Sequence, residues 1–186
     1  QFGNSSSNNK IGCLDSDGDG WANVDDAFDF EPTQWSDTDG DGFGDNSDGI
    51  NADDCVDVAG DSIFDRQGCY DMDEDGYSNP DNMWDEDNGA DAFPQNPLQW
   101  SDVDGDGLGD NWGNSTWLDR PGNWPGIFID SINLNEQDAC PFQPGTSNQQ
   151  GVYGCPDFDG DGWSDDMDMY IQEITQWIDS DGDGFG

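Results

Sequence analysis

Asp15-Ser16-Asp17-Gly18-Asp19-Gly20, at residues 15–20, is the stretch that decides how this chain folds. Carboxylates at alternate positions of a turning loop converge on one point, a glycine permits the sharp bend, and the next residue can offer its backbone carbonyl. The pattern Asp-x-Asp-x-Asp-Gly occurs six times. The six copies, numbered loop 1 to loop 6, begin at Asp15, Asp37, Asp71, Asp102, Asp157 and Asp179.

Ligands of this kind predict calcium, a hard cation that takes six to eight oxygen ligands. Loops 1, 2 and 5 are complete at positions one, three, five, seven, nine and twelve, the seventh being a backbone carbonyl. In loop 1 these residues are Asp15, Asp17, Asp19, Trp21, Asn23 and Asp26. In loop 2 they are Asp37, Asp39, Asp41, Phe43, Asp45 and Asp48. In loop 5 they are Asp157, Asp159, Asp161, Trp163, Asp165 and Asp168.

The other loops are incomplete. Loop 3 offers Asp71, Asp73, Asp75, the Tyr77 carbonyl and Asn79, and loop 4 offers Asp102, Asp104, Asp106, the Leu108 carbonyl and Asp110. Their twelfth positions are Asn82 and Gly113, so each needs a ligand from elsewhere, with Asp85, Asp87, Asp91 or Asp138 as candidates. Loop 6 retains Asp179, Asp181 and Asp183. A merely solvated acidic surface does not explain why the glycines recur in register.

The loops belong to a larger repeat. Gly-Cys precedes loops 1, 3 and 5, at Cys13, Cys69 and Cys155, and Gln-Trp precedes loops 2, 4 and 6. We therefore expect the end of one repeat at 1–12, a repeat at 13–68, a second at 69–154 with insertions near 84–92 and 112–132, and a truncated third at 155–186. The chain is expected to be an excerpt of a longer polypeptide.

Composition restricts the function. Lys and Arg number 3 against 44 Asp and Glu, a formal net charge of −41, which excludes nucleic acid and anionic membranes as partners. Hydrophobic residues make up only 31%, so bound cations and disulfides have to supply much of the folding free energy. No apolar run approaches the roughly 18 residues that a membrane span needs.

An EF-hand sensor is not expected. Such a sensor needs an amphipathic helix on each side of its loop and usually a Glu at position twelve, whereas short proline-containing stretches separate these loops. Only residues 168–177 have helical spacing of apolar residues, so a short helix is predicted there. The calcium ions would be structural and held constitutively.

With its acidic loops, Gly-Cys punctuation and Asp138-Ala139-Cys140-Pro141, the chain resembles thrombospondin type 3 repeats, particularly those of microbial surface proteins. The resemblance spans nearly everything except about 112–132. It implies a mostly irregular fold with little regular secondary structure: an elongated, disulfide-stapled repeat array organised by calcium. It also implies disulfides between neighbouring cysteines.

The chain has five cysteines, so pairing them within the chain leaves one cysteine without a partner. Cys55 with Cys69 and Cys140 with Cys155 occupy equivalent places in two repeats and are predicted as disulfides. By the same spacing, Cys13 would pair with a residue upstream of Gln1 or with a neighbouring subunit; a reactive thiol is the alternative.

Two sequons and a group of aromatic residues lie outside this scheme. Asn4 and Asn114 begin Asn-x-Ser/Thr sequons and are candidate glycosylation sites. Trp35, Trp100 and Trp177 are expected to pack against the backbone of their own repeats. Trp112, Trp117, Trp124 and residues 126–130 would form a small local core or a contact for another subunit or a glycan.

These observations predict a calcium-binding structural glycoprotein, extracellular or at the cell surface, acting as a rigid spacer, stalk or filament subunit. Its partners would be other copies of itself or adjoining repeats. The alternative is a calcium-dependent adhesion or carbohydrate-binding module using the 112–132 insertion. The chain contains no His, which removes the commonest general base, and an enzyme is not expected.

Overall fold

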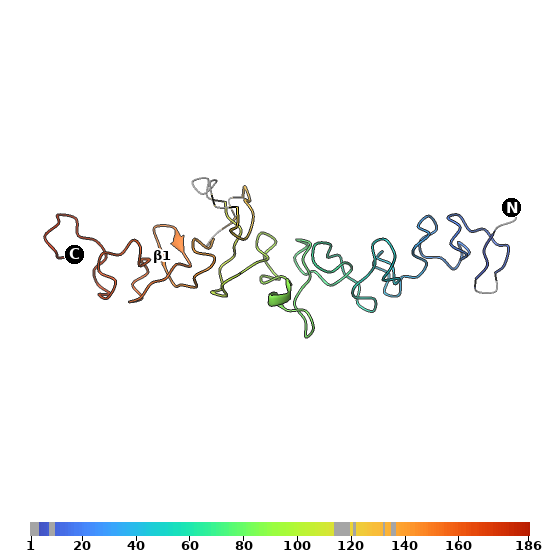
Figure 1. Ribbon diagram of the computed structural model, residues 1–186, viewed down its shortest axis with the longest axis horizontal. Coiled ribbons are helices and arrows are strands. Elements are labelled where there is room, and N and C mark those ends of the chain that lie inside the picture. Colours follow the sequence, from blue (N-terminus) through green and yellow to red (C-terminus); the bar gives the residue numbers. More distant parts are fainter. Residues whose placement is uncertain (1–3, 8–9, 114–119, 121, 132, 135–136) are drawn as a thin grey trace. The chain divides into compact units, whose positions relative to one another are not determined.

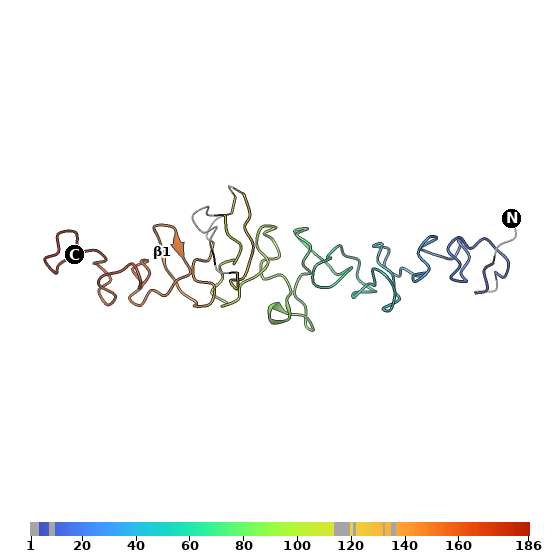
Figure 2. The same ribbon diagram turned by 45° about the horizontal axis from the view of Figure 1, so that its top comes forward.

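The fold is almost entirely irregular, as the sequence predicts. The computed structural model describes residues 4–7, 10–113, 120, 122–131, 133–134 and 137–186. Within these residues there is no α-helix; regular structure consists of one 3₁₀ turn, η1 (Glu86–Asn88), and two short strands, β1 (Asn148–Gln149) and β2 (Val152–Tyr153). In two views the backbone runs through a succession of tight loops (Figure 1; Figure 2).

The chain divides into two compact units, Gln1–Met83 and Trp84–Gly186. The first contains loops 1 to 3 and the second contains loops 4 to 6. Strands β1 and β2 pair antiparallel in the second unit, with Asn148 opposite Tyr153 and Gln149 opposite Val152. Gln150 and Gly151 connect them with φ angles of 54° and 77°, the left-handed values of a tight hairpin turn.

Few apolar side chains are buried, so other groups fill the interior. The buried hydrophobic residues among those described are Ala22, Cys69, Ala90, Leu134 and Cys155. Fully or nearly fully buried polar side chains are more numerous and larger, and they include Gln34, Gln99, Asn111, Asp91, Asp110 and Asp138. An interior of this kind requires that each buried polar group meets a partner.

Two glutamines show how this requirement is met. Gln34 donates through Nε2 to the carbonyls of Asn46 and Ile50, at 3.0 and 3.1 Å, and accepts from the Asn46 N–H at 3.0 Å. Gln99 forms the same paired bonds with the backbone of Asn111, at 3.0 and 2.9 Å. Gln34 and Gln99 therefore hold the chain at the end of loop 2 and loop 4, respectively.

Stacked tryptophans connect loops with the Gln-Trp segments. The rings of Trp21 and Trp35 stack with centroids 6.2 Å apart and planes at 4°, and those of Trp163 and Trp177 stack at 6.0 Å and 11°. Trp35 and Trp177 thus each pack on another indole ring, a contact that the predicted packing against the backbone does not include. Contacts of this type contribute about 0.5–1.5 kcal/mol beyond the area they bury.

The helix predicted at 168–177 is wrong, because this segment forms turns. Asp168 accepts a hydrogen bond from the N–H of Tyr170 at 2.7 Å, and the N–H of Met169 donates to the carbonyl of Trp177 at 3.1 Å. These bonds close a loop instead of a helical turn. Ile171 and Ile174 are 42% and 58% exposed, so the apolar spacing corresponds to no buried face.

Candidate metal centres

The first aspartate of every loop organises the backbone around itself. Its Oδ1 accepts the N–H three residues later at 2.6–2.9 Å, and its Oδ2 accepts the N–H five residues later at 2.7–3.1 Å. In loop 1 the donors are Gly18 and Gly20, whose φ angles of 88° and 104° explain the glycines. In loop 3 Glu74 takes the first of these places, with φ at 65°.

Positions five and nine complete the turn. Oδ1 of the position-five aspartate accepts the N–H of position seven at 2.7–3.0 Å in all six loops. The side chain at position nine, for example Asn23, accepts the N–H of position two, and its own N–H donates to the carbonyl that precedes the loop. Position nine therefore fastens the two ends of the loop.

The position-nine side chains, which the sequence predicts as metal ligands, are therefore already engaged in hydrogen bonds. Both carboxylate oxygens of Asp45 accept hydrogen bonds, from Thr38 and from the Ser36 hydroxyl. Burial raises the pKa of Asp45, but these bonds outweigh it and lower the pKa below its ordinary value. Asn23, Asn79, Asp110 and Asp165 make the corresponding bond to position two.

The carboxylates at positions one, three and five meet as the sequence predicts. In each group, one oxygen per residue lies within 4.8 Å of the others, a separation that one cation can bridge. Six such groups occur among the described residues. Five of them are Asp15/Asp17/Asp19, Asp37/Asp39/Asp41, Asp71/Asp73/Asp75, Asp102/Asp104/Asp106 and Asp157/Asp159/Asp161.

Several of these oxygens are buried and accept no hydrogen bond from any residue that the structure describes. They share one type of position, the second oxygen of the aspartate at loop position three or five. They are Oδ2 of Asp17, Asp19, Asp39, Asp75, Asp104, Asp159 and Asp161. A buried carboxylate oxygen without a donor is costly unless a cation neutralises it.

A second set of aspartates lies outside positions one, three and five, and its members share one hydrogen-bond pattern; we call them the closing aspartates. In each, Oδ1 accepts the N–H two residues later at 2.7–2.8 Å, and the next residue donates its N–H to a distant carbonyl at 2.8–3.2 Å. The closing aspartates are Asp26, Asp53, Asp91, Asp138 and Asp168. The sequence predicts Asp26 and Asp168 as ligands and names Asp91 and Asp138 as candidates, but it misses Asp53.

Electrostatic coupling places four closing aspartates beside a loop of their own unit. Burial, followed by the charges of Asp41 and Asp39, raises the pKa of Asp53 to about 6. Burial, followed by Asp104 and Asp106, raises the pKa of Asp138 to about 7. Burial, followed by the charges of Asp19 and Asp17 in loop 1, raises the pKa of Asp26. In loop 5, burial and then the charges of Asp161 and Asp168 raise the pKa of Asp159, so Asp168 lies close to this loop. Asp53 and Asp138 are 5% and 1% exposed, and the second oxygen of each meets no described donor.

The residues predicted as ligands at position twelve differ in their surroundings from loop to loop. Asp26 and Asp168 occupy position twelve of loops 1 and 5 and are also closing aspartates. In loop 2, the predicted Asp48 is exposed, and its role as a ligand stays a prediction. The carbonyls predicted at position seven, in Trp21, Phe43, Leu108 and Trp163, accept no hydrogen bond from the described residues, and their role likewise stays a prediction.

The two disulfides support loops 2 and 4. Cys55–Cys69 and Cys140–Cys155 are both present, confirming the predicted pairs. Cys13 is exposed and forms no disulfide with another described cysteine, so its pairing outside these residues stays a prediction. The segments that the disulfides enclose donate to loop position five: the Gly60 N–H to Oδ2 of Asp41 at 3.0 Å, and the Gly145 N–H to Oδ2 of Asp106 at 3.2 Å. The disulfides indicate an oxidising compartment.

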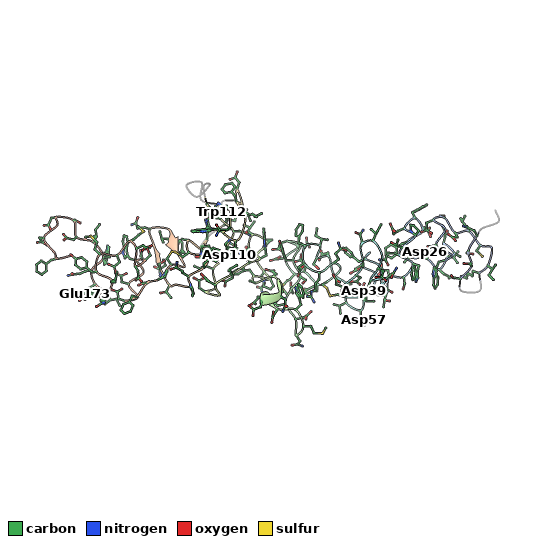
Figure 3. All side chains as sticks on the ribbon, viewed as in Figure 1. Asp26, Asp39, Asp57, Asp110, Trp112 and Glu173 are labelled. Atoms are coloured by element: carbon green, nitrogen blue, oxygen red, sulfur yellow. A yellow bond between two sulfur atoms is a disulfide. The ribbon has the colours of Figure 1, made fainter. Side chains whose placement is uncertain are left out.

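The 112–132 insertion contacts loop 4 through Arg120. Its guanidinium lies between two indole rings, 5.0 Å from the centroid of Trp112 and 4.6 Å from that of Trp124. It also donates to the carbonyls of Asp110, at 3.3 Å, and Asp138. Asp110 and Trp112 are labelled in Figure 3. Arg120 therefore connects Asp110, at position nine of loop 4, with the closing aspartate Asp138.

The remainder of the insertion is only partly packed. Leu134 is buried, and the Trp124 ring meets Phe142 edge to face at 6.5 Å. Ile127 and Phe128 are 54% and 39% exposed. Trp117 and the sequon residue Asn114 lie outside the described residues, whereas Asn4, in the other sequon, is exposed.

Comparisons with known proteins assign no family. No protein-family model matches the chain, and no curated protein matches it at a significant level. Among the described residues, none of the helical structure is long and apolar enough to span a membrane.

Proposed function

We propose that this chain is a calcium-binding structural protein of the extracellular space or cell surface, built from repeats of the thrombospondin type 3 kind. The proposal depends above all on the buried carboxylate oxygens that meet no described donor, at positions three and five of the loops. They recur at equivalent places in a chain of net charge −41, so a bound cation would remove the same electrostatic cost in each repeat.

Calcium fits these donors better than other metals. Each group offers oxygen ligands only, and the chain has no His. Four of the five cysteines are in disulfides, which removes the thiolate ligands that zinc and copper favour. Each loop offers several carboxylates, which suits the six to eight oxygen ligands and variable geometry of calcium more than the strict octahedron of magnesium.

A structural role follows from the way the backbone is held. Position-one carboxylates accept two backbone N–H groups each, and buried apolar side chains are few, so metal binding and folding are expected to be coupled. Such a chain would be ordered where calcium is plentiful and would serve as a rigid spacer, stalk or filament segment. Without a His to act as general base, a non-catalytic role is the simpler proposal.

Small-angle scattering and electron microscopy, with calcium and after chelation, test this role. We expect a stiff particle with calcium, a larger and more variable one after chelation, and recovery when calcium is restored. Equal scattering profiles under both conditions would contradict a calcium-stiffened spacer.

The exposed apolar residues of the insertion favour one second candidate, an adhesive or carbohydrate-binding module. Ile127 and Phe128 are exposed close to the chain segment that carries Trp124. Under this alternative, Phe128→Ala abolishes binding to a glycan array or to cells and leaves the calcium stoichiometry unchanged. Unaltered binding in Phe128→Ala and Trp124→Ala would exclude it.

A further inference from the structure

Three segments that precede a Gly-Cys share one hydrogen-bond frame. In each, a buried serine hydroxyl accepts the N–H of the cysteine, Cys13, Cys69 or Cys155, at 3.0–3.1 Å. The same hydroxyl donates to the carbonyl of the residue three before the cysteine. The serine and carbonyl residues are Ser5 and Lys10, Ser62 and Arg66, and Ser147 and Val152. Lys10, Arg66 and Val152 are therefore structurally equivalent.

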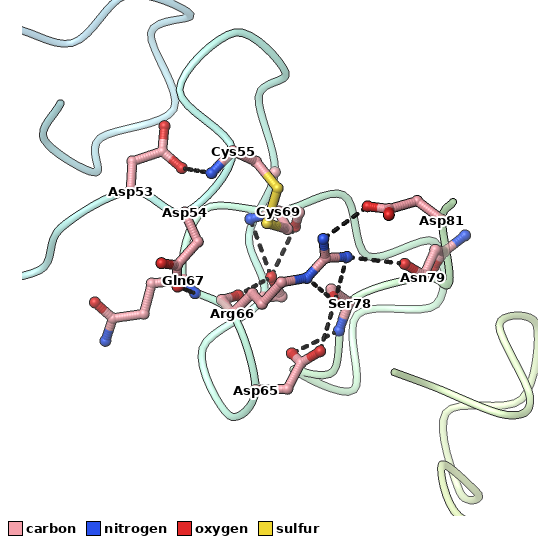
Figure 4. Close-up of a disulfide and its surroundings, with 12 residues drawn as sticks. Asp53, Asp54, Cys55, Asp65, Arg66, Gln67, Cys69, Ser78, Asn79 and Asp81 are labelled. Carbon is pink, nitrogen blue, oxygen red and sulfur yellow. Dashed lines mark hydrogen bonds and ion pairs between the residues drawn. A yellow bond between two sulfur atoms is a disulfide. The ribbon is translucent and has the colours of Figure 1, made fainter. Parts of the chain in front are cut away.

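In the second of these segments the equivalent side chain is an arginine that docks on loop 3. Arg66 donates from Nε and Nη2 to the hydroxyl of Ser78 at 3.1 and 2.9 Å, and from Nη2 to the Asn79 carbonyl at 3.2 Å (Figure 4). Its Nη1 lies 2.7 Å from Oδ2 of Asp81. Ser78 is fully buried, so its hydroxyl depends on this network, which also includes Asp65.

Loop 1 holds a shorter form of the same contact. Lys10 Nζ lies 2.6 Å from Oδ1 of Asp25, which occupies the loop position that Asp81 occupies in loop 3. The residue equivalent to Ser78 is Ala22, which has no hydroxyl to satisfy. A basic side chain thus docks on the loop in two of the three copies.

Loop 5 keeps the receiving serine but has lost the basic side chain. The equivalents of Arg66 and Asp81 are Val152 and Met167, both uncharged. Ser164, the equivalent of Ser78, is 3% exposed, and its hydroxyl has no hydrogen-bond partner among the described residues. A buried hydroxyl without a partner costs free energy that a ligand could recover.

Ser164 lines a pocket of about 190 Å³ in the second unit. Asp165 and Asp166, which follow the serine, add two acidic residues to the lining. The lining residues are Cys140, Gln143, Cys155, Pro156, Ser164, Asp165 and Asp166. The pocket therefore combines an unsatisfied buried hydroxyl with neighbouring negative charge, the two features that receive Arg66 at loop 3.

We propose that the Ser164 pocket is a docking site for an arginine side chain of a partner protein, which takes there the part that Arg66 plays at loop 3. A planar guanidinium can donate to a hydroxyl, a carbonyl and a carboxylate at once. The chain's three basic side chains are engaged elsewhere: Lys10 with Asp25, Arg66 with Asp81, and Arg120 between two tryptophans. None of these three side chains is available for the pocket, so we assign the arginine to a basic partner protein.

The proposal is tested on the whole, calcium-saturated, ¹⁵N-labelled chain by NMR titration in physiological salt. The probe is the peptide acetyl-Gly-Arg-Gly-amide, and the control peptide carries Gln in place of Arg. We expect saturable shifts of the Ser164, Asp165 and Asp166 amides with the arginine peptide, and an affinity about tenfold weaker for the glutamine peptide.

Variants separate this site from general attraction to an acidic chain. Ser164→Ala should lower the affinity for the arginine peptide about tenfold, because a charge-assisted hydrogen bond is lost. The matched change Ser78→Ala should leave binding at Ser164 unaltered. Val152→Arg combined with Met167→Asp should engage the Ser164 hydroxyl from within the chain, as Arg66 engages Ser78, and abolish the saturable shifts. The calcium stoichiometry should be the same in every variant.

Two results would overturn the proposal. Shifts that do not saturate, are spread over all acidic loops and persist in Ser164→Ala would indicate charge attraction alone. Saturable shifts at Ser164 that are equal for the arginine and glutamine peptides would show that the pocket does not select a guanidinium. Neither result bears on calcium binding by the six loops, so the two proposals fail separately.

Discussion

The amide N–H of Gly60 donates to Oδ2 of Asp41 across 19 residues of sequence, at 3.0 Å. Gly60 lies inside the Cys55–Cys69 disulfide, so this bond connects the covalent link to loop 2. The Gly145 N–H makes the same contact with Asp106 inside Cys140–Cys155. In loops 1, 3 and 5 the corresponding oxygens of Asp19, Asp75 and Asp161 have no such donor among the described residues.

Replacing Cys55 and Cys69 by Ser together should lower the calcium affinity of loop 2 and leave loop 1 unchanged. The enclosed segment then no longer holds its N–H against Asp41, and the free energy of unfolding should fall by about 2–4 kcal/mol. Chemical denaturation in calcium measures the stability, and the amide resonances of Gly18 and Gly40 report loops 1 and 2. An equal loss of affinity in both loops would show that the disulfide acts only globally.

Asp53→Asn should weaken calcium binding at loop 2 by about tenfold or more, because it removes one negative charge from the ligand set. The buried Asp53 is coupled to Asp41 and Asp39, whereas Asp48 is exposed. The matched variant Asp48→Asn should therefore have the smaller effect. Calcium titrations followed through the Gly40 and Gly42 amides compare the two. A larger loss of calcium affinity in Asp48→Asn than in Asp53→Asn would indicate that Asp48, at position twelve, is the ligand.

Calcium binding should release protons near pH 6. The pKa values of Asp53, Asp75 and Asp110 are raised to about 6 and that of Asp138 to about 7, chiefly by burial and then by neighbouring aspartates. Without metal, these groups bind protons more tightly in the folded state than in the unfolded state. Their contribution to stability is therefore complete below about pH 4 and is lost as the pH rises through 6 to 7.

Calorimetric titrations in buffers of different ionisation enthalpy measure this release. The number of protons displaced per chain should be largest near pH 5 to 6 and close to zero at pH 8, where the carboxylates are already ionised. The metal-free chain should also lose stability between pH 4 and 7. A heat of binding that does not depend on the buffer at pH 6 would contradict this coupling.

Arg120→Gln should destabilise the second unit by about 1–2 kcal/mol in calcium. The change removes a guanidinium held between Trp112 and Trp124 and its bonds to two backbone carbonyls. Lys10→Gln is the control, since its exposed ion pair with Asp25 should contribute less than about 1 kcal/mol. Denaturation monitored by tryptophan fluorescence measures the free energy of unfolding of both variants. Equal losses would show that Arg120 contributes no more than the exposed ion pair of Lys10.

The loops could be predicted from sequence because their ligand pattern is local. Positions one, three and five, such as Asp15, Asp17 and Asp19, are fixed by hydrogen bonds that span at most five residues. The closing aspartates are harder, because the chain between loop and closing residue varies: Asp26 follows the start of its loop by 11 residues and Asp138 by 36. An aspartate two residues before an aromatic residue or Cys would have been the usable signal.

The errors have physical causes as well. Apolar spacing at 168–177 predicted a helix, but Ile171 and Ile174 stay exposed, so no described element packs on them. The Asp168 carboxylate instead accepts the N–H of Tyr170 and forms a turn. The polar interior was also missed, since Gln34 and Gln99 are buried through paired bonds to backbone that follows the next loop. Such partners become neighbours only after the loops have formed.

The stoichiometry of calcium binding to the chelator-stripped chain, with circular dichroism or NMR recorded through the titration, tests the central claim most directly. The account predicts at least five calcium ions per chain, one for each of the aspartate groups Asp15/Asp17/Asp19, Asp37/Asp39/Asp41, Asp71/Asp73/Asp75, Asp102/Asp104/Asp106 and Asp157/Asp159/Asp161, with ordering of the backbone as they bind. A chain that binds one ion or none, or that is equally ordered without calcium, would contradict it.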